Sequence, residues 1–130
     1  MEDAIKYAGL KPSEINLIMA HGDGTFQGDK NESEAVHNTF TDCIDQINVY
    51  SSKAALGHML AGAPATDIIL GIHIMKNGII PAIHNSMPQD ENIKFNAVTE
   101  GPVKTSVKRI LINSCSSEGQ CASLIIEALN

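Results

Sequence analysis

Aromatic residues, basic residues and long apolar runs are all scarce in this chain of 130 residues. Tryptophan is absent and aromatic side chains make up 4% of the chain, so its core must be built from aliphatic and small side chains. The 9 lysines and arginines are outnumbered by 15 aspartates and glutamates, which gives a formal charge of −6. Such a charge disfavours contact with a phosphate backbone, so no nucleic acid partner is expected.

The chain also lacks the segments that would place it in a membrane. No charge-free stretch reaches the roughly 18 to 20 apolar residues of a membrane span, and the stretch 54–66 is rich in glycine and alanine and contains His58. The first four residues carry no basic leader and no apolar run follows them, so no secretory signal is expected. These observations predict a cytoplasmic protein without a membrane partner.

Cysteines are few and irregularly spaced. Cys43, Cys115 and Cys121 form no recognisable disulfide framework, and no CxxC pair is present to bind zinc. We therefore expect three small, buried, unpaired side chains and no metal site. This use of cysteine agrees with a reducing compartment.

Short apolar runs alternate with helical patterns along the whole chain. This alternation predicts one α/β domain over residues 1–130, with a mixed sheet covered by helices. Strands are expected at 15–20, 47–51, 109–114 and 122–127, with minor extended segments at 79–83 and 93–98. Helices are expected at 2–8, from an Asp29 cap to Phe40, and at 58–76 before Gly78, with a loop at 53–58.

Two histidines lie in glycine-flanked loops that follow strands, where α/β sheets build their active sites. His21 directly follows the strand 15–20, and His58 lies at the start of the longest helix. Lys53 precedes His58 by five residues and Asp67 follows it by nine. A cation and a carboxylate around a histidine can fix its orientation and its protonation state. The other histidines are expected to be structural or solvent-facing: His37, His73 and His84.

Three blocks of this sequence resemble the β-ketoacyl-acyl-carrier-protein synthases, or ketosynthases, of the thiolase superfamily. Residues 20–25, with Gly28, Asp29 and Glu32, are similar to the family's AHGTGT…GDxxE block. Residues 51–63 are similar to its SxKxxxGHxxGAAG block, and 78–81 match the GxIPP stretch after it. Residues 113–119 align with its NSFGFGG turn. The order and spacing hold over nearly the whole chain.

The resemblance implies a thiolase-like fold and, within it, the C-terminal half. The family's nucleophilic cysteine lies at a helix N-terminus in the other half, and none of the three cysteines here matches it. By resemblance, His21 and His58 donate hydrogen bonds to the enolate oxygen that forms when a malonyl thioester loses carbon dioxide. Lys53 and Asp67, which is a glutamate in the family, are then their supporting pair.

The resemblance also implies how substrate arrives. Thr25 matches a residue that hydrogen-bonds the phosphopantetheine arm of an acyl carrier protein, so the chain itself needs no cofactor. Asp23 stands beside that path where the family usually has threonine. We expect it to bind water or an amide, to weaken carrier-delivered substrate, or simply to be an exposed loop residue.

The last block departs most from the family. Ser117 replaces the phenylalanine that gates the acyl pocket, and Glu118 replaces a glycine. The backbone N–H of Ser117 can still serve an oxyanion hole, because that contact needs no side chain. The only basic cluster is either a docking site for an acidic carrier or a solvated approach to a strand: Lys104, Lys108 and Arg109.

Two hypotheses of function remain open. In the first, the chain is a subunit of a split ketosynthase, active only with a separate polypeptide that carries the nucleophilic cysteine. The start at Met1 and the end at Asn130, just after the last strand, favour a natural subunit, and an isolated half is expected to expose an apolar face that needs a partner. In the second, it is a non-catalytic subunit comparable to a chain-length factor. The retained histidines and lysine favour the first, and the altered last turn favours the second. A thiolase without decarboxylation fits less well.

Overall fold

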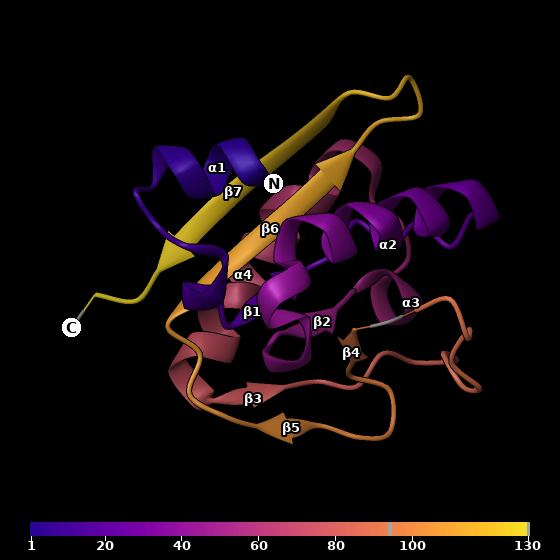
Figure 1. The fold of residues 1–130 in the computed structure, drawn as a ribbon. Coiled ribbons are helices and arrows are strands. Elements are labelled where there is room, and N and C mark those ends of the chain that lie inside the picture. The colour runs from indigo at the N-terminus through magenta and orange to yellow at the C-terminus, as the bar shows by residue number, and fades with distance from the viewer. Residues whose placement is uncertain (94, 130) are drawn as a thin grey trace.

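A mixed sheet with helices on both faces forms the centre of the molecule (Figure 1). The computed structural model describes residues 1–93 and 95–129. The sheet has the strand order β4-β2-β1-β6-β7, formed by Asn96–Ala97, Asn48–Tyr50, Leu17–Met19, Arg109–Cys115 and Cys121–Glu127. All neighbours pair in parallel except β6 and β7, which form an antiparallel hairpin. The expected α/β fold with a mixed sheet is confirmed.

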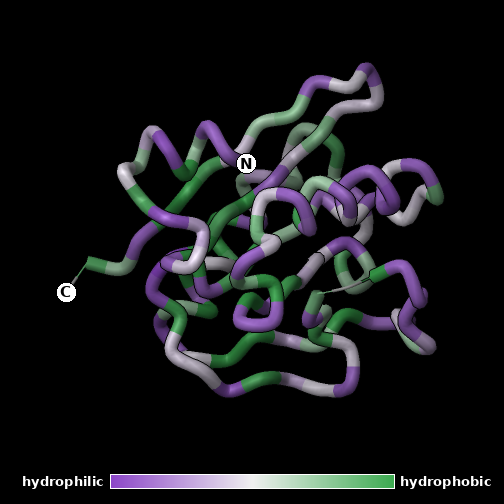
Figure 2. Tube along the Cα trace, in the orientation of Figure 1, coloured by the Kyte–Doolittle hydropathy of each residue, from purple (hydrophilic) through white to green (hydrophobic). Residues whose placement is uncertain are grey.

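Strand β1 shows why both faces of the sheet are covered. Its three residues are fully buried, and successive side chains of a strand point to opposite faces. Ile18 joins one apolar cluster, whereas Leu17 and Met19 join the other. A parallel strand buried on both faces is typical of a sheet between two helical layers. Figure 2 shows the contrast between the sheet and the largely hydrophilic α2.

Helices α1 (Glu2–Tyr7) and α2 (Phe26–Phe40) cover the face that Ile18 points to. In α2 only three side chains are buried, Ser33, Val36 and Phe40, and their spacing places them on one side of a helix. The rest of α2 is mostly polar, with Phe26 exposed at its start, so the contribution of the helix to the core comes from this single stripe.

Helix α4 (Ala63–Asn77) covers the opposite face. Gly71 allows it to approach the sheet closely, because a Cβ there would lie 3.1 Å from Ile126 Cδ1 and 3.3 Å from Met19 Sδ. The helix ends at Gly78, in the left-handed conformation with φ 63°, as the sequence predicts. On its outer side Ile69 and Ile72 are exposed. A separate antiparallel pair, β3 (Ile79–Ile80) and β5 (Val103–Lys104), packs below it (Figure 1).

Helix starts differ from the expected ones. Helix α2 begins at Phe26, not at Asp29, because the Thr25 hydroxyl accepts the Gly28 N–H and so caps it. The expected loop at 53–58 contains a short helix, α3 (Lys53–Leu56), which ends at Gly57 with φ 79°. Helix α4 starts at Ala63 rather than at His58, with a proline in its first turn.

The expectation for the cysteines is correct for one of them and wrong for two. Cys43 is free and buried. Cys115 and Cys121 form a disulfide instead of lying unpaired in the core. They lie directly opposite each other in the β6–β7 hairpin, and the number and spacing of cysteines do not reveal this register. One of the grounds for expecting a reducing compartment is therefore lost.

No helix in residues 1–93 and 95–129 is long and apolar enough to cross a membrane. Within the same residues, no group of three or more histidine, cysteine or acidic side chains is arranged to hold a metal ion.

The two leucines of the β6–β7 hairpin test this account of the core. Leu111 in β6 is fully buried, whereas Leu124 in β7 is 47% exposed. We expect Leu111→Ala to lower the free energy of unfolding by about 2–5 kcal/mol, because it leaves a cavity in the core. Urea denaturation measures this loss. Leu124→Ala should cost less than half as much, and equal losses in the two variants would contradict the burial of β6 between two layers.

Candidate functional site

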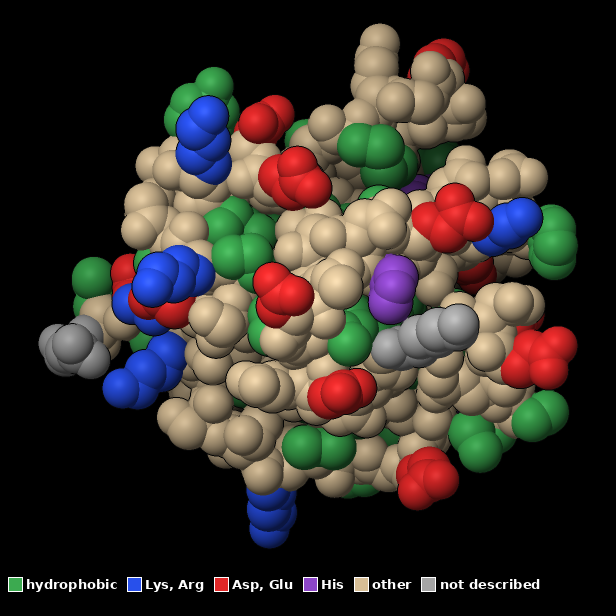
Figure 3. All heavy atoms as spheres, viewed as in Figure 1, with side chains coloured by type: hydrophobic (Ala, Val, Ile, Leu, Met, Phe, Trp, Pro, Cys, Tyr) green, Lys and Arg blue, Asp and Glu red, His purple; other side chains and the backbone are tan. Residues whose placement is uncertain are grey.

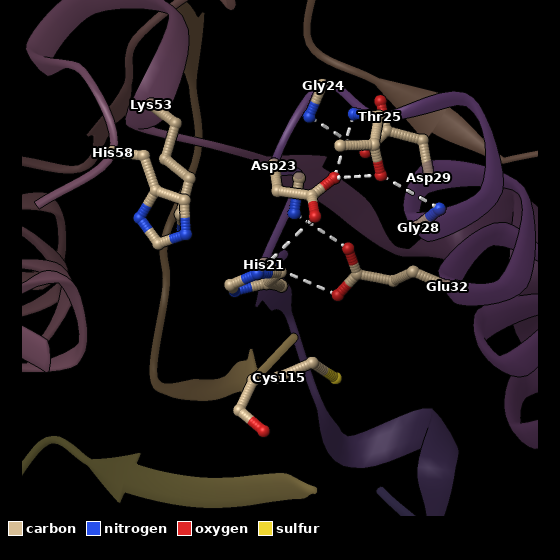
Figure 4. Close-up of polar contacts among 12 residues, drawn as sticks. His21, Asp23, Gly24, Thr25, Gly28, Asp29, Glu32, Lys53, His58 and Cys115 are labelled. Atoms are coloured by element: carbon tan, nitrogen blue, oxygen red, sulfur yellow. Dashed lines mark hydrogen bonds and ion pairs between the residues drawn. The ribbon is translucent and has the colours of Figure 1, made fainter. Parts of the chain in front are cut away.

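The candidate residues gather where the parallel strands end. His21 follows β1 by two positions and Lys53 follows β2 by three. Because β1, β2 and β6 run parallel, their carboxyl ends lie at the same edge of the sheet. Strand β6 continues past its pairing of Ile112 with Met19, so Asn113 and the residues after it reach this edge too. Figure 4 shows His21, Lys53 and Glu32 in this region.

The structure brings His21 and His58 next to each other. Their ring centroids are 5.2 Å apart and their planes are inclined by 80°. His21 is buried, with 8% of its surface exposed, whereas His58 lies in an exposed loop. Two imidazoles from different crossover segments therefore lie in edge-to-face contact.

The protonation pattern of the His58 ring is set by its own loop. Its Nδ1 accepts the Leu60 backbone N–H at 3.1 Å, so a neutral ring carries its proton on Nε2. Leu60 has a φ of 51°, which is unfavourable for a residue with a Cβ. The loop thus holds His58 with a free donor, at the cost of a strained residue.

Glu32 of α2 anchors the backbone at His21. Its carboxylate accepts the N–H of His21 at 2.7 Å and that of Gly22 at 2.8 Å. It also accepts the Asn113 side-chain amide at 2.7 Å, and Asn113 in turn accepts the Ser123 hydroxyl at 2.9 Å. Sequence reasoning left Glu32 and Asn113 out of the site. Both residues belong to blocks that resemble the ketosynthase family, Glu32 to the first and Asn113 to the third, and this membership is the sequence signal that could have identified them.

The environment of His21 favours its neutral form. Burial lowers its pKa below the ordinary value, and the Lys53 ammonium lowers it further, although Glu32 and Asp23 act in the opposite direction. Its Nε2 lies 3.9 Å from Asp23 Oδ2. Its Nδ1 is buried and has no hydrogen-bond partner among the described residues. A neutral imidazole carries one N–H, and no hydrogen bond among the described residues uses either ring nitrogen of His21.

Lys53 and Asp67 form a buried pair under the histidines. Lys53 Nζ lies 3.8 Å from Asp67 Oδ2, with 8% and 2% of the two residues exposed. Ser52 donates its hydroxyl to Asp67 Oδ1 at 2.6 Å. Buried charges are tolerated only when they are paired and hydrogen-bonded, so this cluster holds α3 against α4. The structure thus places all four of His21, Lys53, His58 and Asp67 in one region.

Asp23 and Thr25 organise the loop that leads into α2. Asp23 Oδ1 accepts both the backbone N–H and the hydroxyl of Thr25 at 2.8 Å. A Cβ on Gly28 would lie 2.6 Å from each of these side chains, so only glycine fits there. Partial burial acts to raise the pKa of Asp23, but the two hydrogen bonds from Thr25 and the nearby His21 and His58 act together to lower the pKa below its ordinary value. Asp23 is therefore a loop-forming carboxylate beside His21, and Asp29 supports the same loop by accepting the Gly24 N–H.

Ser117 lies apart from these contacts. It is exposed in the turn between β6 and β7, and its hydroxyl donates to Glu118 at 3.1 Å. No hydrogen bond within residues 1–93 and 95–129 joins it to His21 or His58. The turn takes its positive φ of 85° at Gly119, so Glu118 needs none.

A cleft of about 1230 Å³ opens beside the histidines. It lies between α2 and residues 83–93 and 95–99, and Asp23, Lys53 and His58 also line it. The exposed Phe26 and the side chain of Phe95 line other parts of it. This volume is large enough for an extended substrate.

The basic cluster lies at the other edge of the sheet. Arg109 begins β6, whereas the histidines follow the ends of β1 and the β2 loop. Arg109 is also bound by Glu14 at 3.3 Å and by Glu127 at 2.7 Å. Figure 3 shows basic side chains gathered on the side where the C-terminus lies, while acidic ones are scattered over the viewed face. The contacts of Arg109 favour the hypothesis that this cluster is a solvated approach to β6 over the hypothesis that it is a docking site for an acidic carrier.

Two glycines in the His21 loop offer a matched test. Both have positive φ, 48° at Gly22 and 78° at Gly24, but a Cβ on Gly22 would lie 2.7 Å from Ser51 Oγ, whereas one on Gly24 meets nothing within 4 Å. We expect both alanine variants to lose about 1 kcal/mol of stability from backbone strain. Gly22→Ala should lose clearly more in thermal unfolding, and should shift the NMR resonances of His21. Equal losses would show that Ser51 does not confine this loop.

Asp23→Asn tests the electrostatics around His21. The amide retains an acceptor for Thr25 and removes the negative charge that raises the pKa of His21. We expect the His21 pKa, already below its ordinary value, to fall further in the variant, as measured by NMR titration of the imidazole carbons. The exposed His73 is the internal control and should not respond. A rise in the His21 pKa would refute the arrangement.

Comparison with known proteins places this arrangement in a family. The family model described as "Beta-ketoacyl synthase, C-terminal domain" matches residues 1–87. A "3-oxoacyl-[acyl-carrier-protein] synthase 2" from Staphylococcus aureus is 34% identical over 128 residues, which cover 98% of this chain and 32% of that protein. A "Highly reducing polyketide synthase" from Didymella fabae is 35% identical over 139 residues, covering 98% and 7%.

Solved structures agree with the sequence relatives. "The ishigamide ketosynthase/chain length factor" superposes with a TM-score of 0.90 at 29% identity, over 97% of this chain and 31% of that one. The ketosynthase complex "AntDE:AntF (apo): type II PKS acyl-carrier protein in complex with its ketosynthase bound to the hexaketide" superposes at 0.93 with 26% identity, over 98% and 31%. The chain spans about a third of the length of the bacterial synthase and of these structures. It therefore belongs to the β-ketoacyl synthase family, has the thiolase-like fold and corresponds to the C-terminal domain.

Proposed function

We propose that this chain supplies the histidine-bearing half of a decarboxylative ketosynthase site and that a separate polypeptide supplies the nucleophilic cysteine. The complex would condense malonyl and acyl thioesters in fatty-acid or polyketide biosynthesis. The single observation that carries the proposal is the pair of His21 and His58, whose rings are 5.2 Å apart beside the cleft that His58 lines.

The pair is suited to one difficult step. When the malonyl thioester loses carbon dioxide, the electrons of the broken carbon–carbon bond move into the thioester and its oxygen becomes negative. Two preorganised N–H donors stabilise that oxygen at the moment when its charge develops. His58 offers Nε2–H because its Nδ1 already accepts the Leu60 N–H. His21 offers its single N–H because burial and the Lys53 charge keep it neutral.

Lys53 acts on the histidines through its charge. It is held by Asp67, and its ammonium disfavours a second positive charge on His21. The enolate carbon then attacks the acyl carbon carried on the partner's cysteine. That attack forms the new carbon–carbon bond, and collapse of the resulting tetrahedral adduct breaks the carbon–sulfur bond, re-forms the carbonyl and releases the cysteine thiolate. An acyl carrier protein would present the malonyl group on its phosphopantetheine arm through the cleft, past Asp23, which lines it, and Thr25, which is hydrogen-bonded to Asp23.

The contacts of the cysteines support a second polypeptide. Cys43 packs with Ile18 and Phe40 in the cluster on the α2 face, so its thiol is not offered to substrate. The other two are joined to each other. In addition, Phe26 and Leu60 are 83% and 76% exposed at the rim of the site, where a covering surface would bury them.

A chain-length-factor-like role is the second candidate. The turn at Ser117 and Glu118 favours it, because it lacks the aromatic gate that the resemblance leads us to expect. The oriented His58 ring weighs against it, since a subunit that only shapes a tunnel has no use for a directed imidazole.

Decarboxylation of a malonyl thioester by the assembled complex tests the proposal. The chain is co-expressed with the adjacent reading frame, and released carbon dioxide is measured. We expect His58→Ala to lower the rate by about 100-fold or more, the usual loss when one such donor is removed. His73→Ala, on the exposed side of α4 and outside the cleft, should keep its rate.

Equal rates in the wild type and in His58→Ala, with the partner still bound, would contradict a catalytic histidine pair. That result would favour the chain-length-factor-like role. Co-purification of the partner with each variant shows whether a lost rate reflects lost assembly.

A further inference from the structure

The disulfide between Cys115 and Cys121 has no part in the chemistry proposed above. Cys115 ends β6 and Cys121 begins β7, so the bond closes the turn 116–120 at its base. That turn lies at the edge of the sheet where Glu32 contacts the backbone of His21. Figure 4 shows Cys115 on the side of the site where His21 lies. The two cysteines are thus placed to control a short segment beside the site.

The hairpin brings the two sulfur atoms together without help from the rest of the fold. Ser116 donates its N–H to the Gln120 carbonyl at 2.8 Å, which closes the turn. In an antiparallel ladder the next pair inward is then a non-hydrogen-bonded one, in which side chains approach most closely. Cys115 and Cys121 are that pair, and their Cα atoms are 4.1 Å apart.

We propose that Cys115 and Cys121 are a reversible redox site that tightens or releases the turn 116–120. The reductant is a small thiol of the glutathione class. One of its thiolates attacks the exposed Cys121 sulfur, breaks the sulfur–sulfur bond and leaves a mixed disulfide, with Cys115 as the departing thiolate. A second thiolate resolves the mixed disulfide. Two protons go to the cysteines, two electrons reduce them, and the small thiol becomes its own disulfide.

The fold does not need this bond, which is why reversibility is the expected behaviour. The cysteines are six positions apart in sequence and already adjacent in the hairpin, so the bond removes little additional chain entropy. Ladder pairs continue from Ser114 with Ala122 to Arg109 with Glu127. Exposed disulfides of this kind exchange more readily than buried structural ones.

The effect on the neighbouring site is local. The side-chain nitrogen of Asn113 lies 3.9 Å from Cys115 Sγ, and the same nitrogen donates a hydrogen bond to Glu32 at 2.7 Å. Glu32 remains the stronger acceptor after reduction, so His21 keeps its anchor. The segment that gains freedom on reduction is the turn that contains Ser117. The redox site itself does not depend on the proposed function, whereas any effect of this turn on catalysis through the Ser117 backbone N–H does.

Alkylation in glutathione buffers tests the redox site. The purified chain is equilibrated over graded ratios of reduced to oxidised glutathione, quenched in acid, denatured and alkylated, and its intact mass is measured. Because there are 3 cysteines and Cys43 is free, we expect one adduct under oxidising and three under reducing conditions. The change should reverse with the ratio. Three adducts at every ratio, or one at every ratio, would overturn the proposal.

Hydrogen exchange tests whether the bond controls the turn. Reduction should speed amide exchange in 116–120 by about 10-fold or more and leave the buried β6 amides of 110–112 unchanged. Cys121→Ser should show the fast turn in both buffers and no redox-dependent mass change. A redox transition without a change in the turn would overturn its control by the disulfide. Neither readout depends on catalysis, so failure of the proposed function would leave both results interpretable.

Discussion

The site depends first on one carboxylate that joins three elements. Glu32 lies near the start of α2 and accepts N–H groups from the end of β1 and from Asn113 of β6. Hydrogen bonds to an ionised carboxylate are among the stronger ones in proteins, so a single side chain fixes the loop after β1 to both neighbours. His21 takes its position from this arrangement, and the opening of the cleft beside it follows.

Different contacts act on the two histidine rings. His21 is kept neutral by burial and by the nearby Lys53 charge, against the pull of two carboxylates. Because its pKa is lower in the folded chain than in the unfolded one, its neutral form contributes stability above the unfolded pKa, and this contribution is lost as pH falls through the folded pKa. His58 is exposed and is instead oriented by the Leu60 N–H. A partly open site thus still presents two directed N–H groups.

Features encoded locally could be predicted from the sequence, and those encoded by tertiary contacts could not. The apolar runs predict the buried strands. The position of Gly78 after the long apolar helix predicts that this helix ends there. The start of α2 was misplaced because Thr25 competes with Asp29 for the cap only once Asp23 folds back onto Gly28. A helix that starts at Asp29 would place Glu32 in its first turn, where acidic residues are common, so this position gives no indication of its tertiary hydrogen bonds. The Cys115–Cys121 bond requires the register of a hairpin, which spacing alone does not give.

Asp23 shows how a departure from a family pattern can be absorbed by a fold and still alter its chemistry. One of its oxygens completes the turn before α2, where Gly28 leaves room for it, so the substitution is compatible with the loop. The other lies 3.9 Å from His21 Nε2 and acts to raise the pKa of that ring. Burial and Lys53 outweigh this effect. Lys53 acts in the same direction as burial and favours the neutral form of His21 that the proposed chemistry requires, which gives the buried Lys53–Asp67 pair an electrostatic role as well as a structural one.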